Sequence, residues 1–209
     1  MQKYSRSYFY WYKNIGQLSA VINQKFFNNY INKNDSVLDY GCGGGFLLKK
    51  INCKEKYGYE INKYIIKKEK SLKIYSNFQS IKKKFNKILS NQVLPHVLCP
   101  RTEIINLKKL LTKNGLMIFM FTCDGPSVQY KKKDINFKCY SWSPMGIGNL
   151  FKSCGLKIIK CESFYFKWPP MYEKIYKFFG LKIFNFLSVI YGYVKKNRNY
   201  NIRIVVKNN

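Results

Sequence analysis

Acidic residues, histidine and arginine are scarce in this chain of 209 residues. Ten Asp and Glu residues face 38 Lys and Arg residues, so the formal net charge is +28. Only four of the basic residues are arginine, and lysine carries the rest. Because base and phosphate recognition favours the forked guanidinium of arginine, this composition argues against a nucleic-acid partner. Attraction to anionic lipid or to acidic sugars stays open.

Cysteine pairs and long apolar runs are missing as well. The seven cysteines are odd in number and contain no Cys-x-x-Cys spacing, so neither a metal site nor a disulfide framework is predicted and a reducing, cytoplasmic setting is expected. The first residues show no apolar run with a cleavage site, so no signal peptide is expected. A hydrophobic content of 46% and an aromatic content of 18% exclude a disordered chain. The length suits one α/β domain over residues 1–209.

The most informative segment is residues 37–45, Val-Leu-Asp-Tyr-Gly-Cys-Gly-Gly-Gly, which predicts a buried strand followed by a glycine turn. Glycine at 41, 43 and 45 allows positive φ and lets a ligand approach the backbone closely. Glu60 ends the next predicted strand, at about the 20-residue spacing from which a carboxylate reaches a ribose. The segment therefore predicts a site for a cofactor that carries a nucleoside.

The kind of cofactor follows from two further positions. The dinucleotide fingerprint requires glycine at position 46, where this chain has Phe46. The acidic Asp39 directly before Gly-x-Gly-x-Gly instead resembles the first motif of class I S-adenosylmethionine-dependent methyltransferases. In that family a carboxylate at the Asp39 position helps to hold the methionine end of the cofactor, and one at the Glu60 position holds the ribose hydroxyls.

The resemblance implies positions for the rest of S-adenosylmethionine. Gly41, Cys42 and Gly43 would line the methionine part. The adenine and the methyl group would be contacted by residues at the ends of later strands. These are Ile61, Asn77 and Phe78 for the adenine, and Ser90 and Asn91 for the methyl group.

Alternating apolar strands and helices between residues 37 and 122 predict an open parallel sheet with ligands at the carboxyl ends of its strands. A helix is expected over residues 104–112, with Asn114-Gly115 as its stop, and a strand over residues 116–122. The resemblance implies a Rossmann-like methyltransferase fold with seven strands, mostly parallel, and an antiparallel last strand at residues 201–206.

Residues 86–97 resemble the fourth region of these enzymes, which commonly ends in Leu-Glu-His-Val. Pro95 stands where glutamate is common, and His96 is the only histidine in the chain. Histidine changes charge near neutral pH, so His96 is the candidate general base, with a packing role at a helix start as the alternative.

Residues 140–155 also resemble bacterial methyltransferases encoded among surface-polysaccharide genes. The matching residues are Tyr140, Trp142 and Pro144, followed by a helix that Ser143 caps and Gly155 ends. Tyr140 and Trp142 are therefore candidates for binding the acceptor substrate.

Two helical segments flank this core. Residues 4–31 carry apolar side chains at helical spacing and predict either a cover for the sheet or a lid over the cofactor. Residues 161–200 predict a helical insertion before the last strand. Its apolar part, residues 181–194, is shorter than the about 20 residues that a membrane span needs. It predicts a cap on the domain or, through residues 169–194, a contact with a membrane surface.

The two resemblances together imply methyl transfer from S-adenosylmethionine to a small-molecule acceptor, by O-methylation of a sugar or lipid-linked saccharide. A quinone or lipid head group is the alternative acceptor. A non-enzymatic, lysine-rich module that binds RNA or a membrane is the alternative class. A sugar acceptor predicts a polar pocket and a quinone an apolar one. The sequence makes no prediction of the oligomeric state.

Overall fold

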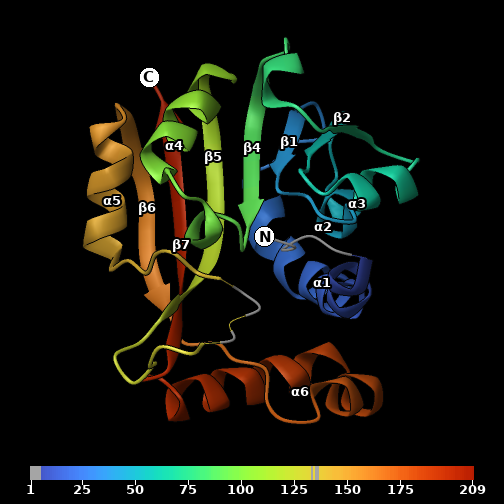
Figure 1. Ribbon diagram of the computed structural model, residues 1–209, viewed down its shortest axis with the longest axis vertical. Coiled ribbons are helices and arrows are strands. Elements are labelled where there is room, and N and C mark those ends of the chain that lie inside the picture. The colour runs from blue at the N-terminus through green and yellow to red at the C-terminus, as the bar shows by residue number, and fades with distance from the viewer. Residues whose placement is uncertain (1–5, 133, 135–136) are drawn as a thin grey trace.

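Seven strands form one sheet in the order β3-β2-β1-β4-β5-β7-β6 (Figure 1). The computed structural model describes residues 6–132, 134 and 137–209, without the side chains of residues 6–12. Residues 4 and 5 of the expected N-terminal segment, and the side chains of its residues 6–12, therefore lie outside the description. The strands are β1 Ser36–Tyr40, β2 Glu55–Tyr59, β3 Lys73–Tyr75, β4 Phe85–Asn91, β5 Leu111–Asp124, β6 Leu156–Phe164 and β7 Asn199–Asn208. The helices are α1 Arg6–Asn28, α2 Phe46–Lys50, α3 Lys63–Lys68, α4 Pro100–Lys109, α5 Pro144–Ser153 and α6 Tyr172–Val194, with single 3₁₀ turns η1 Phe78–Ser80 and η2 Leu94–His96.

The direction of the strands confirms the predicted fold class. All neighbouring pairs from β3 to β5 are parallel, and β7 runs antiparallel to both β5 and β6. The chain leaves β1 toward β2 on one side and returns to β4 on the other. This reversal of strand order between β1 and β4 is where open α/β sheets bind ligands, beyond the carboxyl ends of the strands.

Helices cover both faces of the sheet. On one face α4 and α5 bury Ile104 and Phe151 against the apolar side of β4, β5 and β7. On the other face α1 and α2 bury Phe27 and Leu48 against β1, β4 and β5. Parallel strands between two helical layers are apolar on both sides, which explains the unbroken apolar run of β5.

The boundary between α4 and β5 differs from the prediction. The helix expected over 104–112 is α4, which begins at Pro100 and ends at Lys109. Strand β5 begins at Leu111 because this residue pairs with Phe85 of β4, ahead of an irregularity in the register. Asn114, with φ 62°, lies inside that irregular part of the strand. The prediction was wrong because a turn within a strand carries the same Asn-Gly signal as a helix stop.

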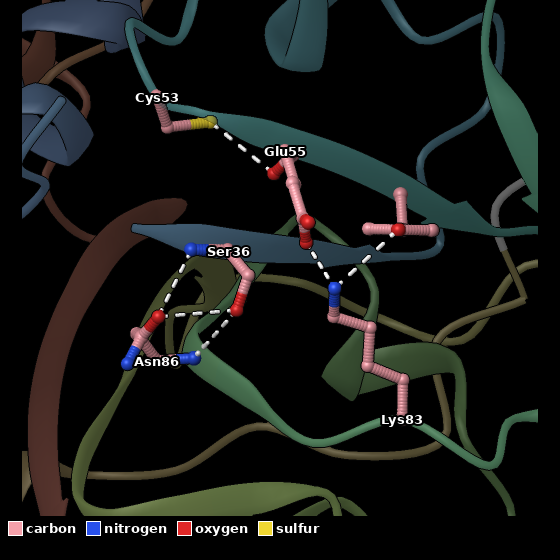
Figure 2. Close-up of polar contacts among 6 residues, drawn as sticks. Ser36, Cys53, Glu55, Lys83 and Asn86 are labelled. Atoms are coloured by element: carbon pink, nitrogen blue, oxygen red, sulfur yellow. Dashed lines mark hydrogen bonds and ion pairs between the residues drawn. The ribbon is translucent and has the colours of Figure 1, made fainter. Parts of the chain in front are cut away.

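Side-chain contacts at the amino ends of the strands fix the register that aims their carboxyl ends (Figure 2). Asn86 Oδ1 accepts hydrogen bonds from the Ser36 backbone N–H at 3.0 Å and from Ser36 Oγ at 3.1 Å. Nearby, Lys83 forms an ion pair with Glu55 of β2. These contacts tie β1 to β4 and β2 to the loop before β4. They therefore hold in register the strands whose other ends carry Asp39 and Ser90.

Helix α6 is the insertion between β6 and β7, and it lies across the carboxyl end of the sheet next to α1 (Figure 1). It is interrupted at Gly180, where φ is 72° and ψ is −178°. Phe184 and Ser188 are buried, whereas Phe178 and Phe186 are exposed. Within the described residues, no helix is both long and apolar enough to cross a membrane.

Candidate active site

The glycine turn directly follows β1. Gly41, Gly43 and Gly45 have φ of 76°, 53° and 68°, values that other residues adopt only at a cost. A Cβ atom on Gly41 would lie 2.4 Å from Cγ2 of Val93, which follows β4. Close packing and a left-handed backbone therefore both require glycine at position 41.

Glu60 is joined to this turn. Its Oε2 accepts a hydrogen bond from the Gly43 backbone N–H at 2.9 Å, and its Oε1 accepts one from the Asn62 N–H at 2.8 Å. Asn62 in turn caps α3 by accepting from the Tyr64 N–H at 3.0 Å. Each carboxylate oxygen can accept a second hydrogen bond, so Glu60 retains capacity for two ligand hydroxyls.

Asp39 supplies a second buried carboxylate, near the carboxyl end of β1. Asp39 is 2% exposed and Glu60 is 7% exposed. Burial, and then the negative charge of Glu60, raises the pKa of Asp39 to about 7. Burial also raises the pKa of Glu60, against the opposing effect of its backbone hydrogen bonds. In the part of the chain that the structure describes, neither carboxylate belongs to an ion pair. Two buried acids without a cation suit a positively charged ligand.

The predicted adenine contacts lie beyond the ends of β2 and β3. Ile61 follows Glu60 and is 50% exposed. Asn77 caps η1 by accepting from the Gln79 N–H at 3.0 Å, and Phe78 packs edge-to-face on Tyr59 with ring centroids 5.5 Å apart. Ile61 thus leaves apolar surface available next to the carboxylate of Glu60.

The predicted methyl-side residues lie at the end of β4. Ser90 is buried and donates from Oγ to the Tyr40 carbonyl at 3.2 Å. Asn91 donates from Nδ2 to Ser19 Oγ of α1 at 3.2 Å and accepts from Asn23 Nδ2 at 3.5 Å. These bonds connect α1 to the carboxyl edge of the sheet.

A cavity of about 640 Å³ lies beside this connection, between α1, the sheet edge and α6. Ser19 and Asn23 line it, together with Gln92, which follows Asn91 and has φ 63°. Gln92 Oε1 accepts from the Thr122 N–H at 2.8 Å, and Thr122 Oγ1 donates to Asn201 Oδ1 at 2.7 Å. The volume is within the range of small-molecule sites.

The sequence analysis did not identify Gln92 or the residues from β7 and α6 as parts of this cavity. A usable signal was present in the last strand, where Asn201 and Arg203 alternate with Ile202 and Ile204. Polar residues at every second position of a central strand place polar atoms on one face of the sheet.

The structure brings the three candidate substrate and catalytic residues together at another place. Tyr140 and Trp142 stack with centroids 5.3 Å apart, and Tyr140 donates from its hydroxyl to the Leu98 carbonyl at 2.8 Å. The Tyr140 N–H also donates to the Pro95 carbonyl, next to His96 in η2. None of the three lines the 640 Å³ cavity. Their roles in catalysis and acceptor binding stay predictions.

Comparison with known proteins identifies the class. The methyltransferase domain family matches residues 10–160, which is most of the chain, so the chain belongs to that family. No curated protein matches its sequence.

Solved structures share the fold at low sequence identity. A Bacillus halodurans protein described as a methyltransferase is 12% identical with a TM-score of 0.63, over 88% of this chain and 96% of that one. Coclaurine N-methyltransferase, bound to N-methylheliamine and SAH, is 12% identical with a TM-score of 0.60, over 90% of this chain and 72% of its own. The [4+2]-cyclase SpnF, 11% identical with a TM-score of 0.53 over 92% and 80% of the chains, shows that the fold by itself does not specify the reaction.

Family membership, the glycine turn and the two buried carboxylates together define an S-adenosylmethionine-dependent methyltransferase. The expected cofactor is confirmed at the level of the family. The alternative of a non-enzymatic module is not supported.

Proposed function

We propose that this enzyme methylates a hydroxyl of a sugar or of a lipid-linked saccharide. The observation that carries the proposal is the lining of the cavity, which combines the amides of Gln92, Asn185, Asn199 and Asn201 with aromatic rings such as Trp168. Amides exchange hydrogen bonds with hydroxyl groups, and rings cover the apolar faces of sugars.

The residues of the chain would act mainly by holding and orienting. When bound, S-adenosylmethionine supplies a methyl group that is activated by its sulfonium. Asp39 would hold the cationic methionine end, Glu60 the ribose hydroxyls, and Ile61 with Phe78 the adenine. Ser90 and Asn91 would border the methyl group. Acceleration would then come from placing the acceptor oxygen in line with the methyl group away from water.

His96 is the proposed general base, and Tyr140 with Trp142 the proposed second acceptor contact. The support is that Tyr140, which stacks on Trp142, donates its backbone N–H to the carbonyl of Pro95, the residue before His96. Pro95 lies two residues after Val93, whose side chain lies close to Gly41 of the glycine turn. His96→Gln is expected to lower kcat more than it raises KM. A rise in KM alone would assign His96 to binding or packing.

A quinone or other lipid head group is the second candidate acceptor. An apolar pocket would suit it, whereas the described cavity is lined by five amide side chains and Arg203. The test is transfer of the ¹³C-labelled methyl group of S-adenosylmethionine, followed by NMR, to a panel of neutral and acidic sugars and of hydroxyquinones. Label on sugars supports the proposal. Label on hydroxyquinones alone replaces it.

We also propose that α6 rests on an anionic membrane surface. Ile183, Phe186, Ile190 and Val194 recur at helical spacing and are between 46% and 68% exposed. Lys174, Lys177 and Lys182 on the same helix and Lys195 and Lys196 after it supply positive charge.

The double variant Phe186→Ser/Ile190→Ser tests this contact by sedimentation with vesicles that contain phosphatidylserine. Loss of vesicle binding by the double variant supports the contact if the control variant, Lys157→Gln on β6, still binds. Equal binding of the double variant and the unaltered protein refutes it.

A further inference from the structure

Arg203 places a guanidinium at the wall of the acceptor cavity. It lies on β7, next to Met120 of β5, and both residues line the cavity. Its Cζ lies 3.9 Å from the ring centroid of Phe164 and 4.9 Å from that of Phe26. The two rings hold the guanidinium in place through cation–π contact and leave its N–H groups for other partners.

No acid forms an ion pair with Arg203 within the described part of the chain, although the negative charge of Glu162 acts on it through space. Glu162 faces Arg203 in the register of β6 and β7, but its carboxylate forms an ion pair with Lys160 at 2.9 Å. Arg203 belongs to none of the ion pairs, and its buried Nε has no hydrogen-bond partner among the described residues. A buried donor with a full positive charge and no partner is costly unless a ligand satisfies it.

The other charged side chain of the cavity wall is also positive. Lys167 adds a second cation, and the residues described around the cavity include neither Asp nor Glu. Two amide oxygens of the wall, Asn185 Oδ1 and Asn199 Oδ1, are also buried without a hydrogen-bond partner in the described structure. They are acceptors, whereas Arg203 and Lys167 are donors. The wall therefore matches a ligand that carries both hydroxyl groups and an anion.

We propose that the acceptor carries a carboxylate or phosphate group, which Arg203 binds as a forked donor while the amides of the cavity bind hydroxyls. The inference rests on the proposed function, because it names the substrate class of the same cavity. The aromatic contacts explain why arginine is suited to this position, since its planar guanidinium stacks on ring faces and still presents a fork of N–H donors. Glu162, which is opposite in register, forms its ion pair with Lys160, so the Nε–H of Arg203 stays available for a ligand.

The test compares three sugars of similar size: glucose, glucuronate and glucose 1-phosphate. Their affinities for the full chain are measured by ligand-observed NMR at about 0.15 M salt, which screens the net surface charge. Glucuronate or glucose 1-phosphate is expected to bind about fivefold or more tightly than glucose, as a charge-assisted hydrogen bond provides. The anion that binds more tightly distinguishes an acidic sugar from a sugar phosphate.

Two matched variants each remove one positive charge. In Arg203→Gln the preference for the anionic sugar is expected to fall to within about twofold, the level left without a charge-assisted bond. Lys157→Gln, on the exposed side of β6, is expected to retain the preference. If Arg203→Gln does not fold, Arg203→Lys is the deciding variant. It keeps the positive charge but lacks the forked N–H donors of the guanidinium, so it must lower the preference for the anionic sugar at least about twofold.

Equal binding of the three sugars by the unaltered protein overturns the inference. So does an Arg203→Gln variant that keeps the preference, or a Lys157→Gln variant that loses it equally. Calorimetry with SAH is run on the same samples and separates the two proposals. Absence of SAH binding refutes the enzyme itself, whereas SAH binding without anion preference refutes only this inference.

Discussion

The Oε2 atom of Glu60 lies 2.9 Å from the backbone nitrogen of Gly43, although the two residues are 17 positions apart. This hydrogen bond joins the end of β2 to the turn after β1. It places the buried carboxylate of Glu60 against the backbone of a glycine, where no side chain intervenes. Both halves of the proposed cofactor site, the turn for the methionine part and the acid for the ribose, are thereby held by one contact.

Glu60→Gln is expected to weaken SAH binding about tenfold or more, because the variant loses charge-assisted hydrogen bonds worth about 1.5–3 kcal/mol each. The measurement is the rise in Tm that SAH produces. This rise becomes smaller as the affinity for SAH decreases. Glu173→Gln, an exposed acid on α6, is the control and should keep the full rise. An unchanged rise in Glu60→Gln would show that this carboxylate does not contact the ligand.

Cofactor affinity is expected to depend on pH through Asp39, whose pKa in the free protein is about 7. A cationic methionine end favours the ionised carboxylate, so binding releases a proton. Affinity should therefore rise with pH up to about 7 and then level off, by at most about tenfold per pH unit. Calorimetry with SAH at pH 6 and pH 8, in buffers of different ionisation enthalpy, measures both effects.

Asp39→Asn is the matched variant for this pH dependence. It should bind SAH weakly at both pH values and release no proton. A proton release that persists in Asp39→Asn would assign the titration to another group.

The same raised pKa has a consequence for stability. Asp39 is protonated more readily in the folded than in the unfolded chain, so its contribution to folding is greatest below about pH 4 and is lost as pH rises toward 7. Between these values the free energy of unfolding of Asp39→Asn should fall less steeply with pH than that of the unaltered protein. Urea unfolding at pH 5 and pH 7 measures the difference. Parallel slopes would contradict the raised pKa.

Gly41→Ala is expected to destabilise the protein by about 1–3 kcal/mol and to weaken SAH binding, because φ of 76° strains alanine and its Cβ meets Val93. Val93→Ala in the same chain should recover part of the loss, since it relieves the contact but not the strain. Gly148→Ala in α5, where the nearest atom to a new Cβ is 3.9 Å away, should be neutral or stabilising. Urea unfolding compares the three variants, and a neutral Gly41→Ala would contradict the geometry of the turn.

Asn86→Ala is expected to lower the free energy of unfolding by about 1–2 kcal/mol, because it removes the acceptor shared by the Ser36 N–H and hydroxyl. A double-mutant cycle with Ser36→Ala isolates the pair and should give a coupling of about 0.5 kcal/mol or more. Additive losses would show that the two residues act independently.

The proposed cofactor half of the site follows from the sequence because its signals are local. A strand, a glycine turn and a carboxylate about 20 residues later specify the geometry around Asp39, Gly41 and Glu60 without knowledge of the remaining fold. The sheet order followed in the same way from alternating strands and helices, together with the resemblance to a known family.

The proposed acceptor cavity could not be predicted because its residues meet only through tertiary packing. Gln92, Asn185 and Arg203 come from the end of β4, from α6 and from β7, and no spacing in the sequence relates them. The alternation in the last strand places Arg203 on one face of the sheet, but its contacts with Phe26 of α1 and Phe164 of β6 become visible only in the folded structure.

The most direct measurement is a calorimetric titration of the full chain with S-adenosylmethionine and with SAH. The account predicts that both bind at one site per chain and that Glu60→Gln and Asp39→Asn each weaken them. No heat with either compound, from a protein whose circular dichroism shows it to be folded, would contradict the assignment of Asp39, the glycine turn and Glu60 as the cofactor site.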